Sequence, residues 1–318
     1  MELSIIVPVY NGESFIFRCL NSLIKQNLQD YEVIIVDDGS IDKTFVIAEL
    51  FCKEHNQFKI YKTENRGVSA ARNYGFQKSS GNYVYFCDSD DCLEENQLLY
   101  IFNKLRSNNL DICIFGINQY LNGVKIEIEH SGSFKLLEKR DALHSILNSS
   151  NIAGYACNKI FKRGVVQDIF FDENIRLEED KLFCINAVHN AEKIGFYDIP
   201  AYNYYLTDNG ATRQCLNLAK YTVIESKEKQ LAAINKDEDG KDNYDIILSD
   251  LISCYCFFFF NLKRLDKDSR KYWKKRILFG FKINRKIKVF NYLSHRRRIA
   301  FIYLFFRTLF VSKKEAPR

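Results

Sequence analysis

The first third of the chain alternates short apolar runs with segments of helical spacing. Four runs rich in β-branched and aromatic residues are closed by turn-forming residues, which is the pattern of buried strands. These predicted strands are residues 3–10, 31–36, 58–62 and 83–87. The segments between them predict helices over 12–27, 42–55 and 68–79, with Asp42 placed to cap the second. This β-α-β-α-β alternation predicts a mostly parallel sheet with helices on both faces.

Beyond residue 90 the pattern changes twice. A helix, an alternating strand-like stretch and two more helices are predicted in turn over 95–107, 111–137, 138–149 and 178–190. From about residue 216 the pattern is mostly helical, with residues 236–243 as an exposed polar connector. We therefore expect an α/β domain over residues 1–215 and a helical region over residues 216–318.

Two acidic clusters stand directly after predicted strands. Asp37 and Asp38 open the first, and residues 88–91, Asp-Ser-Asp-Asp, form the second. In open α/β sheets ligands bind where strands end. Placing five carboxylates so close together costs free energy through mutual repulsion and loss of hydration. This cost must be offset by a bound cation or by hydrogen-bond donors. A divalent metal carrying a phosphate would do so, which predicts a site for a nucleotide diphosphate.

Composition narrows the class of protein. Hydrophobic residues make up 47% of the 318 residues, enough for one large domain or two smaller ones. The ten cysteines are scattered without a CxxC pair and the five histidines lie far apart, so neither a zinc site nor a disulfide framework is expected. The first apolar run is too short for a signal-peptide core, and a reducing, cytoplasmic location is expected. Residues 10–13, Tyr-Asn-Gly-Glu, stand where a GxGxxG would, which argues against a nicotinamide or flavin cofactor.

The net charge of +6 hides a strongly basic C-terminal segment. Residues 263–318 carry about 19 Lys and Arg against about three acids, a division that indicates an anionic partner. Two apolar blocks, 251–260 and 299–311, accompany this charge, and neither approaches the ~20 residues that a bilayer span requires. The basic residues between and around them are Lys271, Lys274, Lys275, Arg276, Lys282, Arg285, Lys286, Lys288, Arg296, Arg297 and Arg298.

Basic residues interleaved with large apolar ones suit a helix lying on an anionic membrane surface. A helical bundle or dimer contact with a solvated basic face is the alternative. Nucleic acid is not an expected partner, because no recognised binding fold accompanies the charge.

Several motifs, in order, resemble family 2 glycosyltransferases of the GT-A fold, the kind that build bacterial capsule, O-antigen and exopolysaccharide. The resemblance runs from Leu3 to about Arg213. Its motifs are residues 4–11 (SIIVPVYN), 36–40 (VDDGS), 65–73 (NRGVSAARN), 88–91 (DSDD) and 178–180 (EED). The resemblance implies a Rossmann-like, mixed and mostly parallel sheet flanked by helices, followed by the helical C-terminal extension.

The resemblance assigns the donor nucleotide to the first acidic cluster. Asp38, with Asp37 beside it, is similar to the carboxylate that accepts hydrogen bonds from the base, while Pro8, Val9 and Tyr10 wall the base pocket. An Asp-Asp-Gly-Ser run is alternatively a simple turn and helix cap.

The second cluster resembles a DXD motif. Asp90 would bind Mn²⁺ or Mg²⁺, and Asp88, with Ser89 between them, would contact the donor ribose or its sugar. Alternate residues of an extended segment point the same way, so the two carboxylates can face one ligand. The same resemblance places Asn65, Gly67 and Arg72 at the donor site. For Arg72 the alternatives are a phosphate contact and an ordinary position on a helix surface.

Residues 179 and 180 resemble the family's ED motif, whose Asp acts as the catalytic base. Asp180 would take the proton of the acceptor hydroxyl, and the attack opposite the diphosphate inverts the anomeric centre. The family often has Gly where Glu178 stands, so Glu179 is the alternative base.

These roles imply an inverting, metal-dependent glycosyltransferase. It would use a nucleotide sugar, with UDP preferred, and a glycan acceptor that is commonly polyprenyl-linked. We expect peripheral attachment to the inner face of the cytoplasmic membrane, and an oligomer is possible. The alternatives are a sugar-phosphate nucleotidyltransferase, and a non-catalytic membrane- or polyanion-binding protein with a vestigial nucleotide pocket.

Overall fold

A computed structural model describes residues 1–148, 152–206, 218–234, 241–284 and 295–308. The chain divides into two compact units. Unit 1 comprises Met1–Glu173 and Glu179–Gln214, and unit 2 comprises Asn174–Glu178 and Cys215–Arg318. The expected connector and the expected boundary near residue 215 lie largely outside the described residues.

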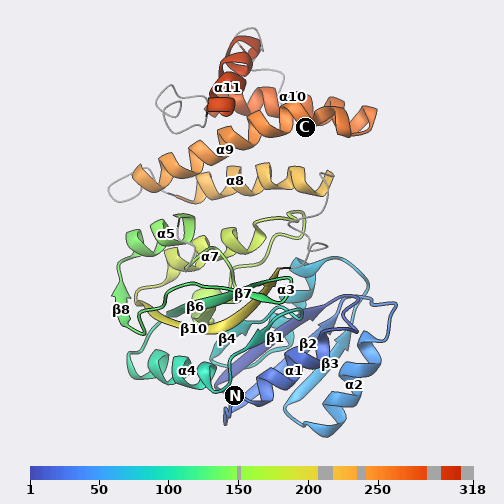
Figure 1. Ribbon diagram of the computed structural model, residues 1–318, viewed down its shortest axis with the longest axis vertical. Coiled ribbons are helices and arrows are strands. Elements are labelled where there is room, and N and C mark those ends of the chain that lie inside the picture. The colour runs from blue at the N-terminus through green and yellow to red at the C-terminus, as the bar shows by residue number, and fades with distance from the viewer. Residues whose placement is uncertain (149–151, 207–217, 235–240, 285–294, 309–318) are drawn as a thin grey trace. The chain divides into compact units, whose positions relative to one another are not determined.

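Unit 1 is built on one sheet flanked by helices (Figure 1). Its strands are β1 (Leu3–Val9), β2 (Tyr31–Asp37), β3 (Phe58–Lys62), β4 (Tyr83–Phe86), β5 (Cys92–Leu93), β6 (Ile112–Leu121), β7 (Val124–Ile126), β8 (Phe134–Leu137), β9 (Lys159–Lys162) and β10 (Ile194–Leu206). Its helices are α1 (Ile16–Ile24), α2 (Thr44–Glu54), α3 (Val68–Lys78), α4 (Gln97–Ser107), α5 (Lys139–Asn148), α6 (Arg163–Val166) and α7 (Glu179–Asn190).

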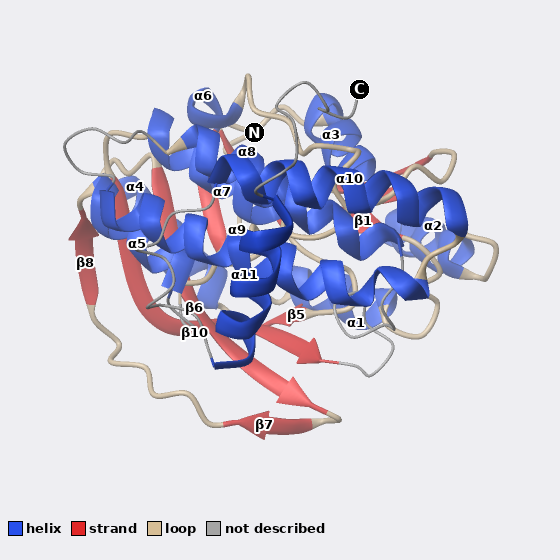
Figure 2. Cartoon of the chain, turned by 90° about the horizontal axis from the view of Figure 1, so that it is seen from above, coloured by secondary structure: helices blue, strands red, loops and turns tan. Residues whose placement is uncertain are grey.

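The strands follow the order β3-β2-β1-β4-β9-β6-β10-β5, with β7 beside β6 and β8 beside β10. The first four strands of this order are parallel, as the sequence pattern predicts, and so are β6 and β10, which run side by side in Figure 2. Strand β9 is antiparallel to both its neighbours, so the sheet is mixed. This is the expected mixed, mostly parallel fold class, and it is confirmed.

Alternate strand residues pack on opposite faces of the sheet. On one face, Leu3, Ile5 and Val7 of β1 join the main core with α1, α2 and α4. On the other face, Ile34 and Val36 of β2 pack against α3. Strands β1 and β2 are buried along their whole length, as expected of central strands covered on both faces.

Three strands of the sheet were not predicted: β5, β9 and β10. Strand β9 has four residues, and β10 has 13 with register shifts around Pro200. Strand β10 contains a proline and ends in the tyrosine-rich segment Tyr202–Leu206, so it does not form the continuous apolar run by which the other strands were predicted. The predicted helices 12–27 and 42–55 are both shorter in the structure, and the Asp42 carboxylate accepts a hydrogen bond from the Thr44 backbone N–H.

Unit 2 is helical, as expected from residue 216 onward. Its elements are η1 (Leu218–Tyr221), α8 (Thr222–Ala233), α9 (Lys241–Asn261), η2 (Leu262–Arg264), α10 (Lys267–Asn284) and α11 (His295–Thr308). Helix α9 contacts α8, α10 and α11, and so forms the centre of the bundle. Buried Tyr255 of α9 and Phe281 of α10 are among the side chains that fill its core.

The first apolar block lies in a longer helix than the sequence analysis predicted. Among the described residues, one helix, Asp242–Arg264, is long and apolar enough to cross a membrane. It has 23 residues, and its most apolar 18-residue window has a mean hydropathy of 1.5. Residues that precede the block at 251 extend the apolar stretch. Half of its most apolar window is nevertheless buried within the structure, as in the core helix of a globular bundle.

The basic residues of α10 differ in their surroundings. Lys271, Lys274 and Lys275 are exposed on α10. Arg276 instead pairs with Glu228 of α8 at 2.6 Å, which makes it part of the bundle rather than of a solvated basic face. Three further predicted surface residues lie outside the described part of the chain: Arg285, Lys286 and Lys288.

Candidate active site

The two acidic clusters lie at the same edge of the sheet, on either side of β1. Val9 at the end of β1 pairs with Asp37 of β2, while Ile6 of β1 pairs with Phe86 at the end of β4. Residues 37–38 and 88–91 therefore follow the carboxyl ends of two strands that share one neighbour. The sequence predicts this placement.

Both carboxylates of the first cluster bind backbone N–H groups. Asp37 is fully buried, and its Oδ1 accepts a hydrogen bond from the Ser40 N–H at 2.6 Å. The Asp38 oxygens accept from the N–H groups of Arg66 (3.0 Å) and Gly67 (2.6 Å). Asp38 thus holds the loop that leads into α3, rather than capping a helix with its side chain. Its contact with a nucleotide base stays a prediction.

Two glycines allow this arrangement. Gly39 has φ +80°, and a Cβ there would lie 2.9 Å from the Asn65 backbone nitrogen. Gly67, with φ +97°, directly precedes α3. Residues that carry a side chain rarely adopt a positive φ, whereas glycine does so without strain, so glycine suits both positions. The turn after β2 and the exposed Asn65 are consequently close together.

Hydrogen bonds join the loop after β1 to the loop after β2. The Asn11 N–H donates to Ser40 Oγ (2.9 Å), and the Gly12 N–H donates to Thr44 Oγ1 (2.7 Å). Tyr10 at the end of β1 is 47% exposed, whereas the preceding Pro8 and Val9 are buried. Of the three residues predicted to wall the base pocket, Tyr10 therefore presents its side chain to solvent.

Tyrosines of β10 hold the second acidic cluster. The Tyr202 hydroxyl donates to Asp91 Oδ2 (2.7 Å) and accepts from the Asp88 N–H (3.3 Å), while the Tyr205 N–H donates to Asp91 Oδ1 (2.7 Å). Asp91 is buried, and burial together with the charges of Asp90 and Asp88 raises its pKa well above the usual value. Asp91 is thus an anchor for the loop, and neither tyrosine was singled out from the sequence.

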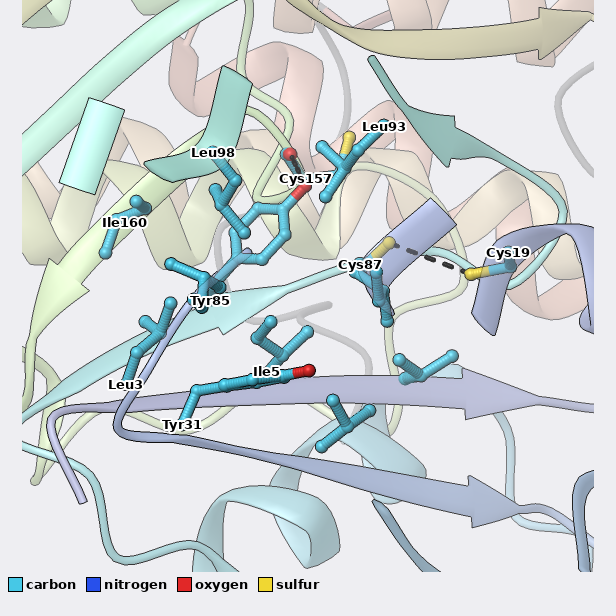
Figure 3. Close-up of a cluster of buried hydrophobic side chains, with 14 of the residues drawn as sticks. Leu3, Ile5, Cys19, Tyr31, Tyr85, Cys87, Leu93, Leu98, Cys157 and Ile160 are labelled. Carbon is cyan, nitrogen blue, oxygen red and sulfur yellow. Dashed lines mark hydrogen bonds between the residues drawn. The ribbon is translucent and has the colours of Figure 1, made fainter. Parts of the chain in front are cut away.

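The main core continues directly under this loop. Cys87, which precedes Asp88, is fully buried, and its Sγ lies 3.9 Å from Sγ of Cys19 on α1 (Figure 3). The Tyr85 hydroxyl donates to the Cys157 carbonyl in the same view. The loop therefore rests on close-packed strand residues.

Arg72 joins the DSD and EED segments. From α3, its Nη2 donates to Asp88 Oδ1 (2.8 Å) and its Nη1 to Glu179 Oε1 (3.0 Å). The side chain is 7% exposed, so it does not occupy an ordinary helix surface. Its guanidinium also lies 5.1 Å from the ring centroid of Phe171. A single buried cation therefore brings together carboxylates 91 positions apart in the chain.

Aromatic packing fixes the helix that carries Glu179 and Asp180. Phe183 of α7 stacks on Phe171 with centroids 4.1 Å apart, and meets Phe86 of β4 and Phe161 of β9 at 5.5 Å. The EED segment thus starts a helix held on the strand that leads to Asp88. Asp180 is partly buried, and burial followed by the Glu179 charge raises its pKa to about 7, with Arg72 opposing the shift.

The carboxylate of Asp90 is the kind of ligand that a divalent cation binds. It is exposed, yet loss of hydration among the surrounding protein atoms and then the Asp88 charge raise its pKa to about 6. The described residues contain no group of three or more His, Cys, Asp and Glu side chains placed around an ion. One or two carboxylates, completed by phosphate oxygens and water, are what Mg²⁺-type sites require. The donor set therefore fits an ion that arrives with a diphosphate.

One more cation, missed by the sequence analysis, lies at the DSD loop. Arg18 of α1 donates to the Asp90 carbonyl, and its guanidinium lies 4.0 Å from the Tyr205 ring centroid. Arg18 lies on the polar face of α1, where the sequence pattern predicts an ordinary surface residue. Only the tertiary structure shows that it contacts the DSD loop.

Comparison with known proteins places this arrangement in a family. The sequence model described as Glycosyl transferase family 2 matches residues 4–170. The chain is 30% identical over 215 residues to the uncharacterized glycosyltransferase EpsJ of Bacillus subtilis (strain 168), which covers 66% of this chain and 62% of EpsJ. It is 32% identical over 212 residues to the poly(ribitol-phosphate) beta-N-acetylglucosaminyltransferase TarS of Staphylococcus aureus (strain Mu50), which covers 65% of this chain and 36% of TarS. The chain thus spans less than two thirds of the length of these relatives.

Solved structures share the fold. The S. aureus TarS 1-349 structure in complex with UDP matches with a TM-score of 0.72 at 23% identity, over 97% of this chain and 88% of that one. The mannosyltransferase PcManGT of Pyrobaculum calidifontis, in complex with GDP-Man and Mn²⁺, matches with a TM-score of 0.55 at 13% identity, over 97% and 87%. The likeness to TarS confirms the predicted GT-A architecture. Since the family's sequence model covers more than half of the chain and includes both acidic clusters, this chain belongs to glycosyl transferase family 2.

Proposed function

We propose that this chain is an inverting glycosyltransferase that moves a sugar from a nucleotide-diphosphate sugar, a UDP-sugar, to a glycan acceptor. The observation that carries the proposal is the Arg72 bridge, which sets a candidate donor carboxylate, Asp88, beside the candidate base segment at Glu179. TarS, which has the same fold, is described in complex with UDP, and this supports the choice of donor.

In this proposal Asp180 is the general base. It accepts the proton of an acceptor hydroxyl while that oxygen bonds to the anomeric carbon and the bond to the diphosphate breaks. The attack from the opposite face inverts the anomeric centre, and the nucleoside diphosphate leaves. A pKa of about 7 suits a base that works near neutral pH. Glu179, paired with Arg72, is the alternative base.

The donor would bind at the strand ends. Asp38 would face the base next to Tyr10, with Asn65 and Gly67 on the adjoining loop, and Asp88 and Ser89 would contact the ribose or the sugar. Asp90 would hold Mn²⁺ or Mg²⁺, which when bound would stabilise the negative charge of the departing diphosphate. PcManGT is described with Mn²⁺, which supports this choice of ion.

We further propose cell-surface polysaccharide synthesis on a lipid-linked acceptor, at the inner face of the cytoplasmic membrane. TarS and its relatives named for poly(ribitol-phosphate) transfer support the polymer class of acceptor. Exposed lysines on α10 and exposed apolar side chains of unit 2, among them Phe260 of α9 and Ile302 of α11, support contact with anionic lipid.

A donor screen tests the proposal. The full chain is incubated with UDP-, GDP- and dTDP-sugars and Mn²⁺, and release of the nucleoside diphosphate is measured with and without glycan acceptors. We expect acceptor-stimulated release from a UDP-sugar, and loss of it when Mn²⁺ is chelated. Release of a nucleoside triphosphate when pyrophosphate is added would instead indicate a nucleotidyltransferase. If the protein neither binds nor turns over any nucleotide sugar, the result would favour a non-catalytic protein with a vestigial nucleotide pocket.

A further inference from the structure

Glu178 has an unusual backbone for its residue type. Its φ is +60°, in the left-handed region that side chains other than Gly, Asn and Asp rarely adopt. It stands directly before Glu179, the first residue of α7. A glutamate held in this conformation next to a candidate catalytic pair needs a compensating role for its side chain.

The side chain and the carbonyl of Glu178 both bind helix α8. Glu178 Oε2 lies 2.9 Å from the Lys227 Nζ and accepts a hydrogen bond from Gln230 Nε2 at 3.1 Å. The Ser226 hydroxyl donates to the Glu178 backbone carbonyl at 2.9 Å. Three residues on one side of α8, Ser226, Lys227 and Gln230, therefore all bind Glu178, and we call this set of contacts the grip of α8 on Glu178.

Lys227 is placed to make this grip firm. It is 3% exposed, and its Nζ also pairs with Asp250 of α9 at 3.1 Å. Burial lowers the pKa of Lys227, but the Glu178 and Asp250 carboxylates outweigh it and raise the pKa above the usual value. A charged, buried ammonium held by two carboxylates has little freedom to release either.

A second contact fixes the same segment two residues earlier. The Arg176 N–H donates to Thr222 Oγ1, at the start of α8, at 3.0 Å. Residues 174–178 accordingly group with unit 2, although the residues on both sides of them group with unit 1. Helix α8 is thus attached to the last residues of the chain before α7 begins.

We propose that Glu178 is a positioning residue, and that its attachment to Ser226, Lys227 and Gln230 of α8 sets the direction in which the chain enters α7 and so orients Asp180 for proton transfer. The inference rests on the proposed function of Asp180. Arg72 holds the neighbouring Glu179 side chain, so backbone and side-chain contacts together define the start of the helix. General-base catalysis depends on such placement, because a displacement of about 1 Å can lower a rate about 100-fold.

Two variants and one matched control test this inference. Glu178→Gly removes the carboxylate and suits the left-handed backbone, so it breaks the grip without adding strain. Glu178→Gln keeps the shape and a hydrogen-bonding oxygen while removing the charge. The control is Glu228→Gln, which removes another carboxylate of α8 that pairs with a cation, Arg276, away from residues 174–178.

Two measurements are made on the full chain. In transfer assays we expect Glu178→Gly to lower kcat about 10- to 100-fold with the KM for the nucleotide sugar nearly unchanged. Glu178→Gln should recover part of the loss, and Glu228→Gln should match the wild type. In hydrogen–deuterium exchange, amides of residues 181–186 should exchange at least several-fold faster in Glu178→Gly than in the wild type or the control.

The two measurements separate failure of this inference from failure of the proposed function. Wild-type kcat together with unchanged exchange in Glu178→Gly would overturn the positioning role, even in an active transferase. Absence of transfer by the wild-type protein would overturn the proposed function, while faster exchange at 181–186 would still support the grip of α8 on the entry to α7. Should Glu178→Gly fail to fold, the same kcat and exchange comparisons are made on Glu178→Gln, for which a wild-type result in both overturns the inference.

Discussion

Transfer should fall as the pH drops below neutral, because Asp180 must be deprotonated to act as a base. Burial and the Glu179 charge raise the pKa of Asp180 to about 7 from an ordinary value of 3.8. Below that pKa the active fraction, and with it kcat/KM, should decrease about tenfold for each pH unit. Because the pKa of Asp180 is higher in the folded protein than in the unfolded chain, the folded protein binds this proton more tightly. The stability that this carboxyl contributes is therefore fully present below pH 3.8 and is lost as the pH rises through about 7.

The Glu179→Gln variant should move this loss of activity to lower pH. The change removes one negative charge but leaves an oxygen that can accept from Arg72 Nη1. After burial, the Glu179 charge is the largest cause of the raised pKa of Asp180. A close neighbouring charge shifts a carboxyl pKa by about one to three units, and solvent screening around the partly exposed Asp180 puts the effect at about one unit. The midpoint of the acid limb should therefore shift to about pH 6.

The assay is the pH dependence of kcat/KM from about pH 5 to about pH 9, with Asp180→Asn for comparison. Asp180→Asn should cut kcat strongly and leave UDP affinity nearly intact when measured by calorimetry. An unshifted midpoint in Glu179→Gln would contradict the electrostatic argument. If Glu179→Gln abolishes transfer while Asp180→Asn retains it, the base is Glu179 instead.

Three further changes test the supports of the site and the proposed membrane contact. Tyr202→Phe leaves the buried Asp91 oxygen without its donor, so unfolding free energy should fall by about 1–3 kcal/mol in urea titrations; unchanged stability would contradict this anchor. At Glu32, burial is outweighed by hydrogen bonds from Ser80, Lys59 and Ser4, which lower the pKa from 4.5 to about 2. Glu32→Gln should thus cost about 2 kcal/mol at pH 7, a difference that must shrink as the pH falls from 4.5 toward 2, and a constant difference would refute it. Replacing three exposed α10 lysines, Lys271, Lys274 and Lys275, by glutamine removes three positive charges. At about 1 kcal/mol per charge, sedimentation with anionic vesicles should weaken about 100-fold, and equal sedimentation would argue against a membrane face.

Local pattern predicts the parallel half of the sheet well. Strands β1 to β4 and the helices between them follow from apolar runs, turn formers and helical spacing, all of which act over a few residues. Strand β10 does not, because Pro200 and the polar, tyrosine-rich end of the strand depend on pairing with β6, which lies far away in the sequence. Likewise the apolar block at 251–260 belongs to a helix whose start at Lys241 precedes it by ten residues.

The sequence predicts where the candidate residues lie but not how they are connected. Ordered acidic motifs at strand ends single out Asp38, Asp88 and Asp90 as candidates, and their roles stay predictions. That Arg72 is buried and pairs with Asp88 and Glu179 together depends on how α3 and α7 pack on the sheet. The same holds for Tyr202, since a buried tyrosine becomes a support of the acidic loop only once β10 lies beside it.

The most direct test of the account is a crystal structure of the full chain with UDP and Mn²⁺, using anomalous scattering to locate the metal. We predict a manganese peak between the Asp90 carboxylate and the diphosphate, with the uracil ring near Asp38, and loss of that peak in Asp90→Asn crystals. UDP bound elsewhere, or a manganese peak that persists without the Asp90 carboxylate, would contradict the claim that these strand ends form the donor site.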